Sequence, residues 1–118
     1  MPLLVEEYSF GRLKLGGRVY TKDIIFTPQR VLDDSWWRAE GHRLAWSDIS
    51  RYVEEAKPGV VVVGTGSSGR MRVGEDVVEA LRGLGLELVA APTGYAVKVY
   101  NKLALRGENV MAALHLTC

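Results

Sequence analysis

The second half of the chain alternates between apolar runs and amphipathic segments. Residues 60–63 are four consecutive valines, and a β-branched run without polar alternation is typical of a strand buried on both faces. Residues 86–90 and 110–116 form further apolar runs. Between the three runs, residues 75–84 and 93–104 carry apolar side chains at helical spacing, and each segment ends near a glycine. The order strand–helix–strand–helix–strand predicts strands of one sheet joined by right-handed crossovers.

A further helix is predicted just before the valine run. Ser47 is suited to cap its start, and Pro58-Gly59 would end it. Thr93 is suited in the same way to cap the helix that follows residues 86–90. The inward face of the first helix would consist of Ile49, Tyr52, Val53 and Ala56.

The first 45 residues predict short strands and turns. Tyr8–Leu15 and Arg18–Phe26 flank Gly16-Gly17, and a two-residue glycine link between such runs indicates a β-hairpin. A second short pair would run through Val31-Leu32 and Trp36–Arg38. The whole pattern predicts one α/β domain, residues 1 to 118, in which the hairpins add a β layer to a sheet flanked by helices.

The composition agrees with a folded protein and disfavours a polyanionic partner. Of the 118 residues, 47% are apolar and 25% are charged, as in ordinary globular domains. Fifteen basic residues nearly balance fourteen acidic ones, so there is no overall positive field to attract nucleic acid. We therefore expect no nucleic-acid partner.

Cysteine usage and the first residues favour the cytoplasm. Cys118 is the only cysteine and cannot form an intrachain disulfide, which is typical of a reducing compartment. The N-terminus has no basic region before its apolar residues, and no apolar run approaches the ~20 residues of a membrane span. We expect a cytoplasmic protein that does not enter a membrane.

The segment Gly64–Arg72, GTGSSGRMR, is the strongest candidate for a functional surface. It follows the valine run and matches G-x-G-x-x-G, a pattern that brings backbone N–H groups close to a phosphate. Dinucleotide binding is nevertheless disfavoured, because Gly74 opposes a helix that starts at the loop. Glu75 and Asp76 would also repel a pyrophosphate from the first turn of that helix.

A looser anion site fits this segment better. The hydroxyl groups, the glycine N–H groups and the arginines together offer donors and positive charge. The alternative is a structural turn whose arginines pair with Glu75 or Asp76. The candidate anion ligands are Thr65, Gly66, Ser67, Ser68, Gly69, Arg70 and Arg72.

Parallel strands would bring three further residues to the same edge of the sheet. Ligands of open α/β sheets bind at the carboxyl ends of the strands, where Thr93, His115 and Cys118 would then lie near the loop. An antiparallel last strand would instead move Cys118 to the opposite edge.

Trp36-Trp37-Arg38 is the second candidate surface. Adjacent tryptophans on a strand face opposite sides, so one is expected in the core and the other partly exposed. An exposed tryptophan beside an arginine is the composition of a protein-interface hot spot. Burial of both tryptophans between layers is the alternative.

No motif in the sequence points to catalysis, a cofactor or a metal. His42 and His115 lack the partners and spacing of a zinc site. The nucleophile-elbow, zinc-protease and paired-carboxylate patterns are all missing. We expect no catalytic residue, no cofactor and no metal ligand.

Several longer strings resemble one known family. They are SFGRLKLGGRVYTKDIIF, WWR-x-x-GH-x-L, VVVVGTGSSGRMRV and YNKLALRG-x-x-V-x-AALHLTC, and they cover the chain from Tyr8 to Cys118. The chain resembles the small domain shared by adipogenesis-associated Mth-domain-containing proteins and mitochondrial complex I assembly factor three. The resemblance implies a three-layer α/β fold with a mixed central sheet and an additional β layer.

The resemblance implies no catalytic activity, and the mitochondrial members act as assembly factors through protein contacts. We therefore expect a non-enzymatic binding or accessory protein with a protein partner and an anion held at Gly64–Arg72. The alternative is a small enzyme or nucleotide-binding protein that uses the same loop.

Overall fold

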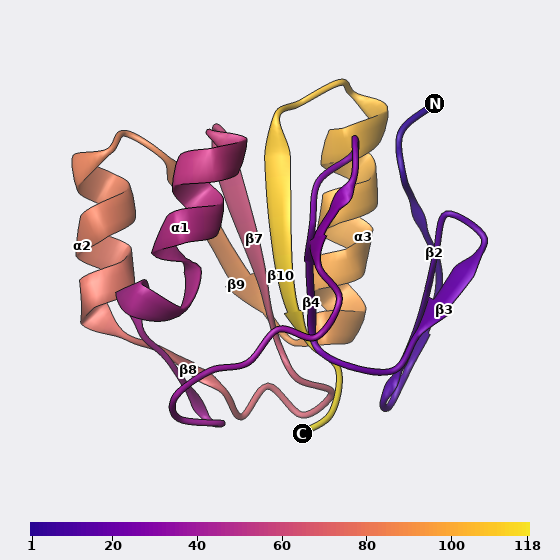
Figure 1. The fold of residues 1–118 in the computed structure, drawn as a ribbon, viewed down its shortest axis with the longest axis horizontal. Helices are drawn as coiled ribbons and strands as arrows, with labels where there is room; N and C mark the ends of the chain where they lie inside the picture. Colours follow the sequence, from indigo (N-terminus) through magenta and orange to yellow (C-terminus); the bar gives the residue numbers. More distant parts are fainter.

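The computed structural model describes residues 1–118 and is built on a five-stranded mixed sheet (Figure 1). The strand order is β5-β4-β10-β7-β9. Its strands are β4 (Ile24–Phe26), β5 (Val31–Asp33), β7 (Val60–Thr65), β9 (Glu87–Ala91) and β10 (Val110–His115).

The three C-terminal strands are parallel, which decides the orientation of the last strand that the sequence left open. Val60 pairs with Val110 on one side and with Glu87 on the other, and both ladders run parallel along β7. The valine run is fully buried, because helices cover both faces of this part of the sheet. The sheet becomes mixed on the other side of β10, where β4 and then β5 pair antiparallel.

The three helices cover the two faces of the sheet (Figure 1). Helices α1 (Trp46–Ala56) and α2 (Glu75–Gly83) lie on one face, and α3 (Thr93–Leu105) lies on the other. Val61 and Val63 accordingly belong to the core beneath α1 and α2, whereas Val60 and Val62 belong to the core that α3 completes. Alternate side chains of one strand thus join two separate apolar cores.

An antiparallel β layer packs against α3 on the side away from α1 and α2 (Figure 1). It consists of β1 (Val5–Ser9), β2 (Arg12–Leu15) and β3 (Arg18–Tyr20). The predicted hairpin at Gly16-Gly17 is confirmed, and both glycines have positive φ, 57° and 84°. The Asn101 amide of α3 joins the layers by bonding the backbone N–H and carbonyl of Val5, each over 2.8 Å.

Several predicted element boundaries are wrong. The run Tyr8–Leu15 is divided by a turn, and Arg18–Phe26 is divided between the outer layer and the central sheet. Trp36–Arg38 is not a strand; the segment after β5 crosses the end of the sheet and lets Arg38 enter the interior. A parallel two-stranded ladder, β6 (Arg43–Leu44) with β8 (Arg72–Val73), forms there instead.

Both predicted helix caps are also wrong. Ala45, two residues before Ser47, is the N-cap of α1, and its N–H donates to the Asp48 carboxylate over 2.8 Å. Thr93 lies inside α3, and its side chain bonds elsewhere. None of the helices is sufficiently long and apolar to cross a membrane.

Candidate functional site

The carboxyl ends of β7 and β10 and the start of α3 are joined by short hydrogen bonds. The Thr93 hydroxyl accepts from the Gly66 N–H over 2.9 Å and donates to the His115 carbonyl over 2.6 Å. The Ser67 N–H donates to the Thr117 carbonyl over 2.7 Å. The parallel strands therefore bring the glycine loop, Thr93 and the C-terminal residues to one edge, as the sequence analysis predicts.

The glycines of the loop are required by this close packing. Gly66 has φ 103°, and a Cβ atom there would lie 2.8 Å from the Thr117 carbonyl oxygen and 2.9 Å from that of Cys118. A Cβ atom on Gly64 would lie 2.8 Å from the Thr93 hydroxyl. The formal dinucleotide pattern thus has a structural reason of its own, which is the contact of β7 with the C-terminus and α3.

Most backbone N–H groups of the loop, including those of Gly66 and Gly69, are used inside the protein. The N–H groups of Gly66 and Ser67 are bonded as described, and the Gly69 N–H donates to the Gly66 carbonyl over 3.1 Å. The N–H groups of Met71 and Arg72 donate to the carbonyls of Thr65 and His42. The N–H groups of Gly66 and Gly69 are therefore not available to an anion.

The two arginines of the loop are exposed and form no ion pair. The alternative pairing of Arg70 or Arg72 with Glu75 or Asp76 is therefore not found. Asp76 instead accepts the Trp46 N–H over 2.8 Å and pairs with Arg43 over 3.4 Å. The Trp46 N–H bond is the main reason why the pKa of Asp76 is lowered.

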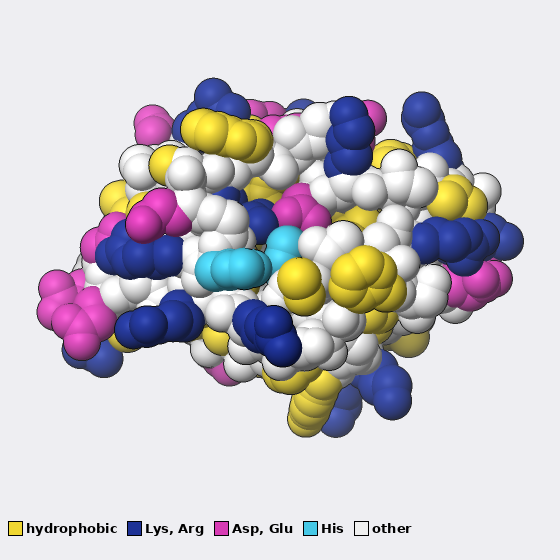
Figure 2. Space-filling view, turned by 90° about the horizontal axis from the view of Figure 1, so that it is seen from below, with side chains coloured by type: hydrophobic (Ala, Val, Ile, Leu, Met, Phe, Trp, Pro, Cys, Tyr) yellow, Lys and Arg dark blue, Asp and Glu magenta, His cyan; other side chains and the backbone are white.

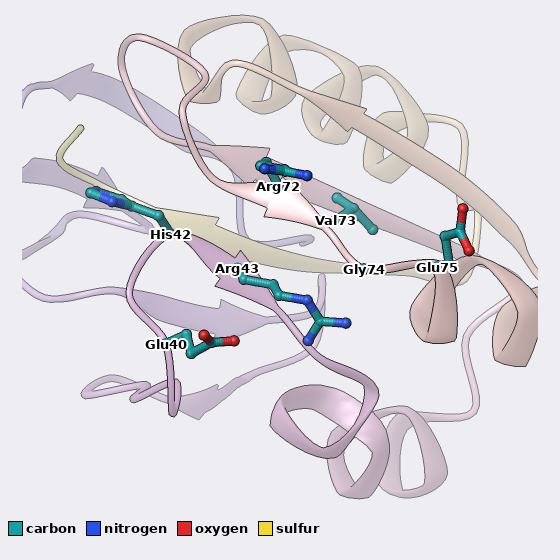
Figure 3. A pocket seen from close by; sticks show the side chains of 7 residues that line it. All are labelled: Glu40, His42, Arg43, Arg72, Val73, Gly74 and Glu75. Atoms are coloured by element: carbon teal, nitrogen blue, oxygen red, sulfur yellow. The ribbon is translucent and has the colours of Figure 1, made fainter.

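A cavity of about 580 Å³ lies next to the loop, along the β6–β8 ladder (Figure 3). Arg72 and Arg43 reach it from the two strands, whereas Glu40 and Glu75 lie at opposite sides of it (Figure 3). The cavity thus collects positive and negative side chains from segments far apart in the sequence. Its complete lining is Glu40, His42, Arg43, Arg72, Val73, Gly74 and Glu75.

Behind the cavity, a largely buried charge cluster joins Asp23, Arg38 and His115. Arg38 Nη1 lies 2.9 Å from Asp23 Oδ2 without being directed at it, so the contact is an ion pair rather than a hydrogen bond. His115 Nδ1 lies 2.8 Å from the same oxygen and 3.1 Å from Arg38 Nη2. The arginine and histidine side chains are only 4% and 9% exposed. The cluster therefore ties together β10, the segment before β4 and the crossing segment after β5.

The two contacts of His115 Nδ1 require different protonation states of this nitrogen. A proton on Nδ1 donates to Asp23, whereas a lone pair accepts from Arg38. Arg38 Nη2 has another acceptor, the Gly41 carbonyl at 3.1 Å, and a carboxylate is the stronger acceptor. We therefore assign the proton to Nδ1. Burial acts to raise the pKa of Asp23, but hydrogen bonds from His115 and the Leu116 N–H, with the charge of Arg38, lower it overall.

The ring of His42 connects the cavity with this cluster. It lies edge-on to the His115 ring, with 6.5 Å between centroids and 69° between planes. Figure 2, which looks at this end of the molecule, shows the histidine side chains next to acidic and basic ones. His42 is exposed and lines the cavity, whereas His115 lies behind it.

The cluster was missed by sequence reasoning, although one signal was present. His115 lies in the otherwise apolar run AALHL, and a polar group in a strand buried on both faces needs a polar partner. The partners Asp23 and Arg38 are 92 and 77 residues away, so nothing local identifies them.

Of the proposed interface residues Trp36, Trp37 and Arg38, only Trp37 is exposed. Trp36 is only 4% exposed and Arg38 7%, whereas Trp37 is 78% exposed. The Arg38 guanidinium packs on the Trp36 ring, with its central carbon 4.7 Å from the ring centroid. One tryptophan in the core and one exposed agrees with the sequence prediction, but Trp36 and Arg38 do not present surface to a partner.

No group of three or more His, Cys, Asp or Glu side chains is placed to hold a metal ion. Cys118 is half-buried at the C-terminus, near the glycine loop.

Comparison with known proteins identifies relatives of the same fold. Residues 5–115 match the family model described as a protein of unknown function, DUF498/DUF598. A Bordetella parapertussis protein of known crystal structure is 27% identical, with a TM-score of 0.83 over 98% of this chain and 96% of that one. A conserved hypothetical protein from Pyrococcus horikoshii is 24% identical, with a TM-score of 0.77 over 97% and 98%.

A Bordetella pertussis protein described as a Mth938-like domain is 23% identical, with a TM-score of 0.77 over 97% of this chain and 85% of that one. These structures agree with the expected mixed α/β fold.

Proposed function

We propose a function from the residues of the site, because this chain belongs to the DUF498/DUF598 family, whose description assigns no activity. The proposal is that the protein is a non-enzymatic accessory protein that acts by binding. It uses protein contacts, and it holds an anionic group in the cavity beside Gly64–Arg72.

The observation that carries this proposal is the position of Arg72. Its side chain lines the cavity together with Arg43 and His42, and it has no carboxylate partner in the protein. A guanidinium without an internal partner is suited to a carboxylate or phosphate, which it recognises with two parallel hydrogen bonds. The volume of about 580 Å³ is typical of small-ligand sites.

The acidic lining restricts which anion fits. Glu40 and Glu75 balance the formal charges of Arg43 and Arg72, so a bare polyanion gains no net attraction. A ligand that carries an anionic group at one end and hydrogen-bond donors at the other matches both kinds of side chain. We therefore propose that the cavity binds a small ligand, or a side chain of a partner protein, that carries both an anionic group and hydrogen-bond donors. A nucleoside triphosphate does not match this lining.

The environment of His115 supports binding rather than acid–base catalysis. A general base must reach the proton that it removes, but the Nδ1 of His115 contacts Asp23 and Arg38, and its Nε2 is buried.

Trp37 supports protein contacts, because its side chain is 78% exposed and tryptophan is enriched at interface hot spots.

Anion titration tests the cavity. Thermal unfolding of the wild type, Arg72→Ala and Arg82→Ala would be followed with acetate, phosphate, NAD and the zwitterion phosphoethanolamine. A ligand at 100 times its dissociation constant stabilises the native state by about 2.7 kcal/mol. We expect phosphoethanolamine to stabilise the wild type and Arg82→Ala in this way and to have no such effect on Arg72→Ala. Arg82 is the control because it lies in α2, outside the cavity lining.

Phosphoethanolamine should stabilise more than phosphate does at equal concentration, because Glu40 and Glu75 attract its ammonium group. An equal response of wild type and Arg72→Ala to every ligand would contradict the proposed cavity.

A further inference from the structure

The outer surface of α3 carries a row of three cations. Lys98, Lys102 and Arg106 are four residues apart, all three are exposed, and none forms an ion pair. Residues four apart on a helix lie one above the other on the same face. We call these three residues the α3 cation row.

A shallow apolar strip runs beside the row. The same residues line a surface hollow of about 590 Å³ together with Tyr95, Val99 and Leu103. Val99 and Leu103 are half-buried and pack against the core, whereas Tyr95 is 57% exposed. The outer surface of α3 therefore presents cations and apolar groups side by side.

The stability of α3 explains only some of the charges in the α3 cation row. Lys102 and Arg106 lie at its C-terminal end, where positive charge is favoured by the helix dipole. Lys98 lies nearer the middle of α3, and like charges four residues apart destabilise a helix. No carboxylate of the protein neutralises the three charges, so they are available to a partner.

We propose that the α3 cation row docks an acidic segment of a partner protein. Cations four residues apart on a helix are separated by about 6 Å along its axis. In an extended chain, side chains on one face recur at about 6.6 Å. Alternate glutamates of such a segment would therefore meet the cations in turn, because they project from the same face of the chain. The methylene groups of these glutamates would lie on the strip of Val99 and Leu103.

A protein segment fits this surface better than nucleic acid does. Nucleic-acid-binding domains commonly have a pI above about 9 and a broad basic face. This chain has a pI of about 7.9 and a net charge of +1, and the row consists of three residues only. The apolar strip also has no counterpart in a phosphate backbone.

The docking of an acidic segment rests on the proposed accessory role and gives it a second surface, separate from the cavity at Arg72. The following experiment leaves that cavity intact. Its failure would therefore not count against the anion proposal, and failure of the anion titration would not count against docking at α3.

Fluorescence anisotropy with a dye-labelled peptide of alternating serine and glutamate would test the docking surface. We expect the wild type to bind this peptide and Lys98→Glu/Lys102→Glu to bind it about tenfold more weakly, because each reversal replaces an attraction by a repulsion. The matched control, Arg18→Glu/Arg82→Glu, has the same net charge and lies outside the hollow. It should keep most of the affinity.

A peptide with glutamine in place of glutamate should bind more weakly than the acidic one, and added salt should reduce the difference. Circular dichroism would verify that both double variants are folded, and Lys98→Gln serves as the test variant if the reversal unfolds the protein. Equal affinities of the wild type and the α3 variant would overturn the proposal. Tighter binding of single-stranded DNA, or of phosphatidylserine vesicles, than of the acidic peptide would also overturn it.

Discussion

Two charged regions of the molecule, the cluster around His115 and the α3 cation row, use charge in opposite ways. At the carboxyl end of β10, Arg38 and His115 are buried, Asp23 is largely buried, and the three contact one another within 3.1 Å. On the outer surface of α3, Lys98 and Lys102 are exposed and unpaired. A buried charge needs its partners for the protein to fold, whereas a solvated charge contributes little to stability and remains free for binding.

The largest expected effect follows from removing one member of the buried cluster. Arg38→Ala leaves the Asp23 carboxylate without its cation and removes packing from Trp36. Loss of one partner of a buried ion pair costs about 3–5 kcal/mol, so we expect a large fall in the urea midpoint. Lys98→Ala on the solvated side should change the free energy of unfolding by less than about 0.5 kcal/mol. Similar midpoints for the two variants would remove the distinction between the regions.

A smaller but still large effect is expected from Gly66→Ala. Its φ of 103° and the carbonyl oxygens 2.8 and 2.9 Å from a Cβ atom leave no room for a side chain beside the C-terminus. We expect the free energy of unfolding to fall by about 2 kcal/mol or more, because the alanine side chain would both strain the backbone and clash with the two oxygen atoms. The matched variant is Gly83→Ala, at the end of α2, where nothing lies within 4 Å of the new methyl group.

Gly83→Ala should leave the protein equally stable or stabilise it by up to about 1 kcal/mol. Thermal unfolding measured side by side would show the contrast, and a Gly66→Ala protein as stable as the wild type would refute the packing role of this glycine.

The smallest effect concerns acid pH. The folded-state pKa of Asp23 is lowered, so its ionised form stabilises the native state above the unfolded pKa of about 3.9. This stabilisation is lost as the pH falls through the lower folded-state pKa. Urea unfolding between pH 2 and pH 6, about the range of this titration, should therefore show a shallower dependence in Asp23→Asn than in the wild type. Curves of identical slope would show that Asp23 does not contribute to acid unfolding.

The sequence alone determined the elements whose signals are local. The valine run predicted β7, the spacing of apolar residues predicted the three helices, and Gly16-Gly17 predicted the hairpin of the outer layer. The alternation of strands and helices predicted that β7, β9 and β10 belong to one sheet, but it left the orientation of β10 open. These features depend on periodicity and turn chemistry within about 20 residues, which a single sequence displays directly.

Only the tertiary structure decided what surrounds each charged residue. Arg38 was assigned to an interface from its neighbours in the sequence, but the fold buries it against Asp23 and against His115, which is 77 residues away. The glycine N–H groups were expected to be free, but the C-terminus and Thr93 occupy two of the loop's donors. Hydrogen bonds and ion pairs form between segments that folding brings together, and their strength depends on burial. Neither property is encoded in the local pattern of apolar and polar positions.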